Sequence, residues 1–326
     1  MELHNYFNHK TILITGATGL IGSNLVKRLL QYPDNDMILV GRSKEKLEKV
    51  FGHHERIRLV EHDISTPFLE GLGHIDCIYH AASPISGGTI QNEPVSVIKA
   101  NLDGTLYCLE YLKKQKNESG GDGTMIVFSS ATVYGSSIDE DIKVDETMTK
   151  SAEDLDALIA PYSESKRMIE VMSRAYARQY GIDVKIARIG YVYGYTPILP
   201  RTALYDFLKI VGRGENIVFG KTGFGRRDNI YIDDVIEGLL YITAKGTSSE
   251  SYNVSSAGDL ENFASIDEMA QIIVDAANNG TKVIIQECNQ RSGGVILDNT
   301  KLKNLGWSVK TSLIQGITNL YKSVNK

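Results

Sequence analysis

Apolar segments rich in β-branched residues recur along the first 190 residues, and stretches with helical periodicity separate them. The six segments span residues 11–15, 37–40, 57–60, 75–79, 125–128 and 184–189. Strands that alternate with helices are typical of a parallel, doubly wound sheet. Because the segments are almost continuously hydrophobic, we expect helices on both faces of the sheet. The pattern predicts an α/β fold, in which ligands bind beyond the carboxyl ends of the strands.

A glycine-rich turn at residues 15–22, with the sequence TGATGLIG, links the first apolar segment to the first helical stretch. Glycines spaced three apart allow a tight turn, bring bare backbone against a pyrophosphate and let the helix pack close to its strand. This arrangement is typical of a Rossmann-type dinucleotide-binding domain, although the glycine pattern alone is a weak signal. The residues expected to contact the cofactor here are Gly16, Thr18, Gly19, Leu20, Ile21 and Gly22.

The regular alternation ends near residue 194, and five glycines interrupt the chain between residues 212 and 225. We therefore expect a dinucleotide-binding domain at residues 1–194 and a smaller, mixed α/β substrate lobe at residues 195–326. Residues 230–256 are expected to rejoin the first domain.

Composition excludes several classes of protein. A formal net charge of -5 argues against a general nucleic-acid binder, which usually presents a basic face to phosphates. The start of the chain lacks the apolar core of a signal peptide, and no apolar run approaches the ~20 residues that span a bilayer. Cys77, Cys108 and Cys288 lack paired or metal-like spacing. We expect a cytoplasmic protein with free thiols, no metal and no membrane partner.

Tyr162 and Lys166 lie four residues apart at the start of a helical stretch that runs to about Tyr180. One helical turn places both side chains on one face. A tyrosine that acts as a base near neutrality needs its pKa lowered by ~3 units, or ~4 kcal/mol, and a nearby ammonium can supply much of that. The alternative is an incidental pair on a solvated helix.

Ser130 ends the fifth apolar segment, where the ligand crevice is expected. Its hydroxyl can hold a substrate oxygen while Tyr162 takes or gives a proton. The alternative is a serine that only binds backbone at a strand end.

Taken together, the glycine turn, Ser130, Tyr162 and Lys166 resemble the extended short-chain dehydrogenase/reductase family, particularly its nucleotide-sugar epimerases and dehydratases. The resemblance covers nearly the whole chain and includes the motifs HAAS at residues 80–83, NLDGT at 101–105, RDNIYIDDV at 227–235 and LGW at 305–307. It implies a homodimer formed through two helices of each subunit, residues 101–113 and 162–180.

Roles for further residues follow from this resemblance alone. It implies that Asp63 and Ile64 flank the adenine and that Lys166 also holds the nicotinamide ribose. Arg227 and Arg291 would pair with the phosphates of a nucleotide sugar. The other positions that it assigns to the cofactor are Ala81, Ala82, Ser83, Asn101 and Tyr162, and those that it assigns to the substrate are Ser130, Ala131, Thr132 and Tyr191.

The cofactor is expected to be NADP or NAD, and the end of the second apolar segment favours NADP. An NAD-preferring site usually offers an acid to the adenosine ribose there, whereas this chain has Arg42, Ser43 and Lys44. A guanidinium forks well onto the oxygens of a 2′-phosphate. If Arg42 only stacks on adenine or lies in solvent, NAD remains acceptable.

The two positions that follow Ser130 bear on the type of reaction. Related dehydratases have Asp-Glu there, and related sugar-acid decarboxylases have a glutamate at the second position. Ala131 and Thr132 cannot exchange a proton as a carboxylate does. The run SATVYG is instead similar to that of nucleotide-sugar 4-epimerases, which favours C4 epimerisation of a nucleoside diphosphate hexose through a 4-keto intermediate.

Tyr191 departs from this pattern, because epimerases and decarboxylases commonly have asparagine at its position. The run YVYG also occurs in ketoreductases, so an NADPH-dependent reductase of nucleoside diphosphate 4-keto sugars is the main alternative. A dehydratase or a decarboxylase is less favoured. A non-catalytic cofactor sensor would be expected to lack Tyr162 or Lys166, and both are present.

Overall fold

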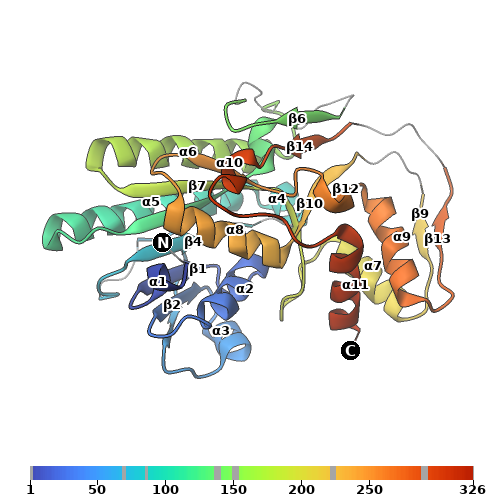
Figure 1. The fold of residues 1–326 in the computed structure, drawn as a ribbon, viewed down its shortest axis with the longest axis horizontal. Helices are drawn as coiled ribbons and strands as arrows, with labels where there is room; N and C mark the ends of the chain where they lie inside the picture. The colour runs from blue at the N-terminus through green and yellow to red at the C-terminus, as the bar shows by residue number, and fades with distance from the viewer. Residues whose placement is uncertain are drawn as a thin grey trace.

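A twisted parallel sheet forms the centre of the computed structural model (Figure 1), which describes residues 3–67, 71–84, 87–135, 141–148, 154–220, 225–287 and 293–325. Within these residues the sheet has seven strands in the order β11-β7-β5-β4-β1-β2-β3, and every pairing is parallel. The strands are β1 (Thr11–Thr15), β2 (Asp36–Gly41), β3 (Ile57–Glu61), β4 (Cys77–His80), β5 (Thr124–Ser130), β7 (Asp183–Ile189) and β11 (Ser251–Val254).

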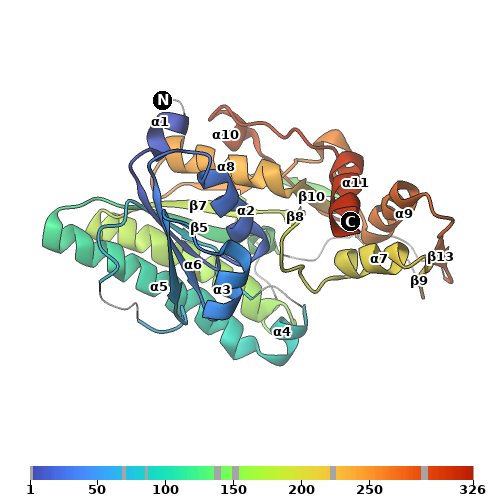
Figure 2. The same ribbon diagram turned by 90° about the horizontal axis from the view of Figure 1, so that it is seen from below.

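Helices cover both faces of the sheet, as the continuous apolar segments predict. Figure 2 shows α5 (Pro94–Ser119) and α6 (Ala160–Tyr180) together on one face and α8 (Ile232–Lys245) on the other. The alternation along β1 explains this, since Ile12 and Ile14 pack into the core under α2 (Leu20–Leu29) and α8, whereas Leu13 packs into the core under α5 and α6. The doubly wound α/β prediction is confirmed.

The chain beyond residue 194 builds a smaller lobe and also returns to the sheet through α8 and β11. The lobe elements lie on one side in Figure 1. They comprise α7 (Ala203–Gly212), α9 (Ile266–Ala277), α11 (Leu313–Val324), β10 (Arg227–Tyr231), β12 (Phe263–Ala264), β9 (Ile217–Phe219) and β13 (Val283–Ile285). Strand β8 (Tyr191–Tyr193), just before residue 194, pairs with β10. The remaining elements are α1 (Leu3–Phe7), α3 (Lys44–Phe51), α4 (Gly87–Asn92), α10 (Thr300–Lys303), β6 (Ile142–Val144), β14 (Val295–Leu297), η1 (Ala131–Tyr134) and η2 (Asp259–Glu261). The boundary at residue 194 stays a prediction.

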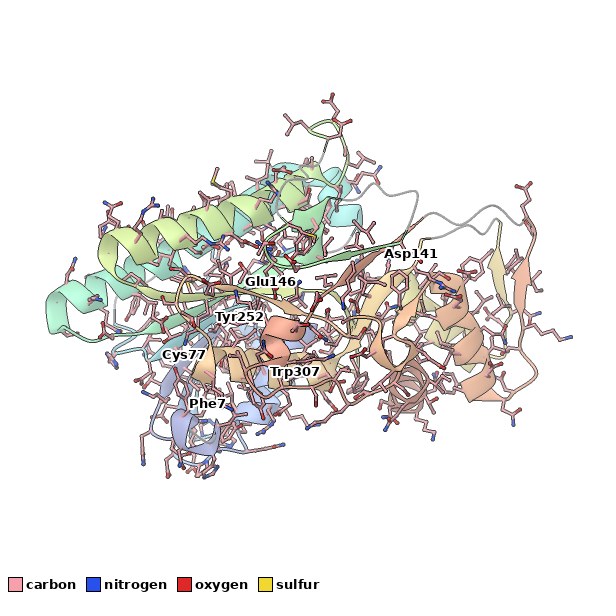
Figure 3. All side chains as sticks on the ribbon, turned by 45° about the horizontal axis from the view of Figure 1, so that its top comes forward. Phe7, Cys77, Asp141, Glu146, Tyr252 and Trp307 are labelled. Atoms are coloured by element: carbon pink, nitrogen blue, oxygen red, sulfur yellow. The ribbon has the colours of Figure 1, made fainter. Side chains whose placement is uncertain are left out.

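Trp307 ties the chain end to α8. Its side chain is buried (Figure 3), and its Nε1 donates to the Asp234 backbone oxygen at 3.0 Å. The Asp234 carboxylate in turn accepts from the backbone N–H groups of Lys310 and Thr311, both at 3.0 Å. Two motifs of the resemblance, residues 227–235 and 305–307, therefore meet in the fold.

The two helices of the predicted dimer have apolar side chains in different surroundings. Leu109 is fully buried in the core, whereas Met168 and Val171 on α6 are 51% and 61% exposed. The exposed pair leaves the homodimer as a prediction. Within the described part of the chain, no helix is long and apolar enough to cross a bilayer.

The glycine turn gives a first prediction, on stability. Gly16 has a φ of +64°, and a Cβ there would lie 2.7 Å from the Ala82 backbone nitrogen. Gly120 has a φ of +65° with open space around it. Gly120→Ala is expected to lower the free energy of unfolding by about 1 kcal/mol, from backbone strain alone. Gly16→Ala is expected to lose about 3 kcal/mol, because overlap adds to the strain. Urea denaturation measures both, and equal losses would contradict the close approach.

Candidate active site

Backbone packing fixes the glycine turn against the end of β4. At Gly16, a Cβ would also lie 2.8 Å from the carbonyl carbon of Ala81. At Gly22 in the first turn of α2, a Cβ would lie 2.8 Å from Ala17 Cα. Both positions therefore need glycine for steric reasons, and the turn runs directly beside residues 81 and 82.

The N-terminus of α2 suits an anion. The first N–H groups of any helix lack an intrahelical acceptor. The N-cap residue here is Gly19, which has no side chain to accept hydrogen bonds from them. Leu20 and Ile21 pack their side chains on the core, which leaves their backbone N–H groups as the binding atoms at these positions. Unsatisfied N–H groups and the positive helix end match a pyrophosphate. This donor set fits a dinucleotide, and Thr18 lies half-buried beside it.

Thr15 and His80 reinforce the junction between β1 and β4, a contact that sequence reasoning did not single out. Thr15 Oγ1 lies 2.8 Å from His80 Nδ1 and accepts a hydrogen bond from the Ala82 N–H at 3.2 Å. Burial, with a further contribution from the Lys166 charge, lowers the pKa of His80 to about 3. The imidazole is therefore neutral. The one sequence feature that could have indicated this contact is the place of His80 in the HAAS motif.

Ser130, Tyr162 and Lys166 come together at the carboxyl end of β5. Ser130 is 9% exposed and accepts a hydrogen bond from the Thr132 N–H at 3.2 Å. Tyr162 and Lys166 lie in the first two turns of α6, with Lys166 Nζ 5.6 Å from the centre of the tyrosine ring. The Ser130 side chain lies close enough to the Tyr162 phenol to lower its pKa. The arrangement can hold one oxygen atom between a hydroxyl and a phenol.

The electrostatics of Tyr162 differ from the sequence expectation. Burial raises the pKa of Tyr162, and the contact with Ser130 only partly offsets this. Lys166 Nζ donates to the Phe128 backbone oxygen at 2.7 Å, away from the phenol. Burial lowers the pKa of Lys166 itself to about 7. The ammonium one turn away therefore does not by itself make Tyr162 acidic.

Asn101 on α5 joins this helix to α6, which carries Tyr162 and Lys166. It is 1% exposed, donates from Nδ2 to Ser165 Oγ at 2.8 Å and accepts from Ser83 Oγ at 2.7 Å. Ser165 Oγ donates in turn to the Tyr162 backbone oxygen at 2.8 Å. The Asn101 amide is thus engaged within the protein, and its predicted cofactor contact stays a prediction.

The ends of β2 and β3 lie together at the predicted adenosine side. Arg42 is exposed, whereas the Ser43 hydroxyl caps α3 by accepting from the Lys46 N–H at 3.2 Å. Hydrogen bonds from Ser65 lower the pKa of Asp63, and the Arg42 charge contributes to this. Ile64 is buried. The Arg42 side chain is therefore exposed to solvent near the Asp63 carboxylate.

Tyr191 and Arg227 form a stacked pair. The Arg227 guanidinium lies 4.7 Å from the centre of the Tyr191 ring, which is 42% exposed. The Tyr191 charge also contributes to the raised pKa of Tyr162, after burial. In η1, Ala131 is half-buried, and Thr132 Oγ1 is buried without a hydrogen-bond partner among the described residues. Arg291 and Cys288 lie outside the described residues.

Cys77 and Cys108 are buried free thiols, and burial raises the pKa of both, that of Cys77 to about 12. They carry no reactive thiolate near neutral pH. In the part of the chain that the structure describes, no three His, Cys, Asp or Glu side chains gather to hold a metal ion.

The sheet, the uncapped helix and the Ser130, Tyr162 and Lys166 cluster define a dinucleotide-binding enzyme of the short-chain dehydrogenase/reductase type. A family profile described as "NAD dependent epimerase/dehydratase family" matches residues 12–255. The chain belongs to this family.

Relatives of known sequence and structure span several reactions. UDP-glucuronic acid decarboxylase 5 of Arabidopsis thaliana is 30% identical over 94% of this chain and 86% of its own length. The structure of a UDP-glucose 4-epimerase with UDP-glucose from Thermotoga maritima has a TM-score of 0.77 at 25% identity, covering 96% of this chain and 97% of that one. An epimerase structure from Methanothermobacter thermautotrophicus has a TM-score of 0.82 at 20% identity, covering 99% and 94%.

The buried lysine gives a prediction for pH dependence. Lys166 loses its proton near pH 7 in the folded chain, whereas an unfolded lysine keeps it to about 10.4. The unfolded state therefore binds more protons between these values, and this group makes stability rise with pH there. The unfolding free energy of the native chain minus that of Lys166→Met is expected to rise by at most about 1.4 kcal/mol per pH unit from pH 7 to 10.

Urea denaturation at several pH values measures this difference. The exposed Lys322→Met is the control for the loss of a lysine side chain. A flat difference for Lys166→Met would contradict the depressed pKa.

Proposed function

We propose that the protein is a nucleotide-sugar epimerase that inverts C4 of a nucleoside diphosphate hexose through a 4-keto intermediate. The observation that carries the proposal is the contact between Ser130 and Tyr162 beside Lys166, followed by Ala131 and Thr132 in place of carboxylates. Such a site can move a proton at one sugar oxygen but has no acid in η1 to expel water.

Each step of the proposed reaction has a group to perform it. Ser130 holds the sugar 4-hydroxyl by a hydrogen bond, and Tyr162, as phenolate, takes its proton while the C4 hydride leaves. NAD(P), when bound, supplies the acceptor and then the donor of that hydride. The 4-ketone turns in the pocket, takes the hydride on its other face and recovers the proton from Tyr162. Substrate and product have the same atoms, so no reductant is consumed.

The phenolate needs a positive neighbour, because burial raises the Tyr162 pKa in the cofactor-free chain. Lys166 is the group that can provide this charge, provided that Nζ turns from the Phe128 oxygen toward the phenol. A ribose hydroxyl in the crevice would give Nζ a new acceptor near Tyr162. The proposed role of Lys166 therefore includes holding both ribose and phenolate.

Tyr191 and Arg227 are proposed to bind the substrate, the first beside the sugar and the second at a phosphate. Their stacking, together with the contribution of Tyr191 to the pKa of Tyr162, supports this order. Arg291 is proposed as a second phosphate ligand. Several relatives are named for UDP sugars, which supports a nucleoside diphosphate sugar as substrate.

A second candidate is an NADPH-dependent reductase of nucleoside diphosphate 4-keto sugars. Two observations favour it: the exposed Arg42 at the end of β2, and the phenol of Tyr191 where asparagine is common. The same Ser130, Tyr162 and Lys166 would serve one reduction. Arg42 is also the basis for proposing NADP as the preferred cofactor. We further propose a homodimer in the cytoplasm.

Product analysis on a panel of nucleotide sugars, with and without NADPH, separates the candidates. An epimerase is expected to give a diastereomer of unchanged mass with no net reduced cofactor. A gain of two hydrogens indicates the reductase, and a loss of carbon dioxide or water indicates a decarboxylase or a dehydratase.

Tyr162→Phe is expected to lower kcat by about 10²–10⁴-fold, as loss of a positioned acid–base group does. Dinucleotide binding, measured by fluorescence titration, should be kept. Normal turnover by this variant would exclude the mechanism. Dinucleotide binding by the native chain without turnover of any sugar would instead favour a cofactor sensor.

Arg42→Ala tests the cofactor preference. A charge-assisted hydrogen bond is worth about 1.5–3 kcal/mol, so the Kd for NADPH is expected to rise at least about tenfold while that for NADH changes little. Lys49→Ala, at the far end of α3, is the matched control and should change neither Kd. If NADH binds more tightly than NADPH to the native chain, the preference is wrong.

A further inference from the structure

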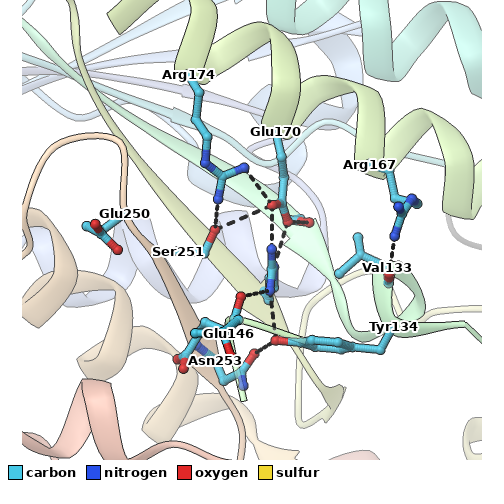
Figure 4. Close-up of polar contacts among 12 residues, drawn as sticks. Val133, Tyr134, Glu146, Arg167, Glu170, Arg174, Glu250, Ser251 and Asn253 are labelled. Atoms are coloured by element: carbon cyan, nitrogen blue, oxygen red, sulfur yellow. Dashed lines mark hydrogen bonds and ion pairs between the residues drawn. The ribbon is translucent and has the colours of Figure 1, made fainter. Parts of the chain in front are cut away.

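Glu170 is a carboxylate buried behind the catalytic residues that the reaction does not use. It lies on α6 one turn beyond Lys166, is 3% exposed, and accepts hydrogen bonds from two arginines and two serines (Figure 4). The donors are Arg188 Nε at 2.8 Å, Arg188 Nη2 at 2.8 Å, Ser129 Oγ at 2.6 Å, Arg174 Nη1 at 3.1 Å and Ser251 Oγ at 3.4 Å.

Arg188, on β7, connects Glu170 to the Tyr134 hydroxyl. It is 1% exposed and holds Glu170 with two parallel hydrogen bonds. Its Nη1 donates to the Tyr134 hydroxyl at 2.9 Å and to the Glu146 backbone oxygen at 3.0 Å. The Tyr134 hydroxyl then donates to Asn253 Oδ1 at 2.6 Å, as Figure 4 shows.

The ion pair therefore holds both ends of the short segment that carries Ser130. Ser129 lies immediately before Ser130 and bonds to Glu170, whereas Tyr134 ends the turn after Ser130 and bonds to Arg188. Glu170 also lies on the helix that carries Tyr162 and Lys166. One buried pair thus contacts the two elements whose separation sets the distance between the Ser130 hydroxyl and the Tyr162 phenol.

Stability alone is a poor reason for such a pair. Removing two charges from water costs about as much as their attraction returns, and well-packed apolar replacements are often neutral or stabilising. Burial would raise the pKa of Glu170, but the two Arg188 hydrogen bonds and its charge outweigh this, so the carboxylate stays ionised. The pair does, however, fix a bidentate geometry, which an apolar contact cannot do.

We propose that Glu170 and Arg188 are positioning residues, which act through Ser129 and Tyr134 to hold Ser130 at hydrogen-bonding distance from Tyr162. The proposal deepens the function proposed above and rests on it for its kinetic readout. Its physical consequence is a property of the protein alone, because contact with Ser130 lowers the pKa of Tyr162.

The direct test is the double variant Ser129→Ala/Tyr134→Phe. It leaves the ion pair intact and removes the two links to the Ser130 segment, together with the hydrogen bond from Tyr134 to Asn253. The expected result is a kcat lowered at least about tenfold with little change in KM, and an acidic limb of the pH-rate profile moved up by about one unit, since the phenol that must ionise loses a stabilising hydrogen bond.

Tyr79→Phe is the matched control, because the Tyr79 hydroxyl makes a buried hydrogen bond to Thr243 Oγ1 at 2.7 Å away from the site. It should lower the melting temperature comparably and leave kcat and the pH profile unchanged. Native kcat and an unchanged profile in the double variant would overturn the proposal.

A measurement without substrate separates this proposal from the proposed function. In protein labelled with 3-fluorotyrosine, the ¹⁹F signal that Tyr162→Phe removes reports the titration of Tyr162 in the free chain. Its midpoint is expected to rise by about one pH unit in Ser129→Ala/Tyr134→Phe but not in Tyr79→Phe. An unchanged midpoint overturns the positioning role, whether or not any sugar is turned over.

The apolar double variant Glu170→Met/Arg188→Met tests the pair itself. Because both charges are removed, it should fold and bind dinucleotide, yet show the same raised Tyr162 midpoint. A native midpoint in this folded variant would reduce the pair to a structural role and overturn the proposal.

Discussion

The parallel pairing of β1, β4, β5 and β7 is the constraint on which the candidate site depends. Parallel neighbours bring their carboxyl ends to one edge of the sheet, so the glycine turn after β1, the backbone of residues 81 and 82 after β4, and Ser130 at the end of β5 lie side by side. Gly16 then allows the turn to touch the β4 end directly. The glycine turn and Ser130 are thus spaced by the ladder itself rather than by flexible loops.

Helix α6 is not part of this ladder. Apolar side chains such as Ile169 pack it against the sheet, and polar contacts fix its orientation. Lys166 and Glu170 bond to β5 at Phe128 and Ser129, and Arg167 donates to the Val133 oxygen at 2.7 Å. Asn101 bonds to Ser165 and so joins α5 to α6. Hydrogen bonds are directional in a way that apolar packing is not, and this direction is what a proton transfer between Ser130, Tyr162 and a substrate oxygen requires.

The parts of the molecule set by local periodicity could be predicted from the sequence. The six strands are found within two residues or so of the predicted ranges, and the spacing of Tyr162 and Lys166 placed both on one helix face beside Ser130. The Glu170–Arg188 pair could not be predicted, because charged residues are usually exposed and no spacing links a helix glutamate to a strand arginine. The raised pKa of Tyr162 depends on burial and on where the Lys166 side chain turns, which residue spacing does not encode.

The return of β11 to the sheet has a consequence for how the chain is assembled. β11 pairs with β7 and is the outermost strand on that side, although more than sixty residues separate the two along the chain. Until it docks, the almost wholly buried β7 presents an open row of N–H and C=O groups, which is the kind of edge that recruits strands from other molecules. During synthesis from the N-terminus, the first six strands of the sheet therefore emerge with an unprotected flank, and the lobe elements between β7 and β11 must be made before that flank is sealed.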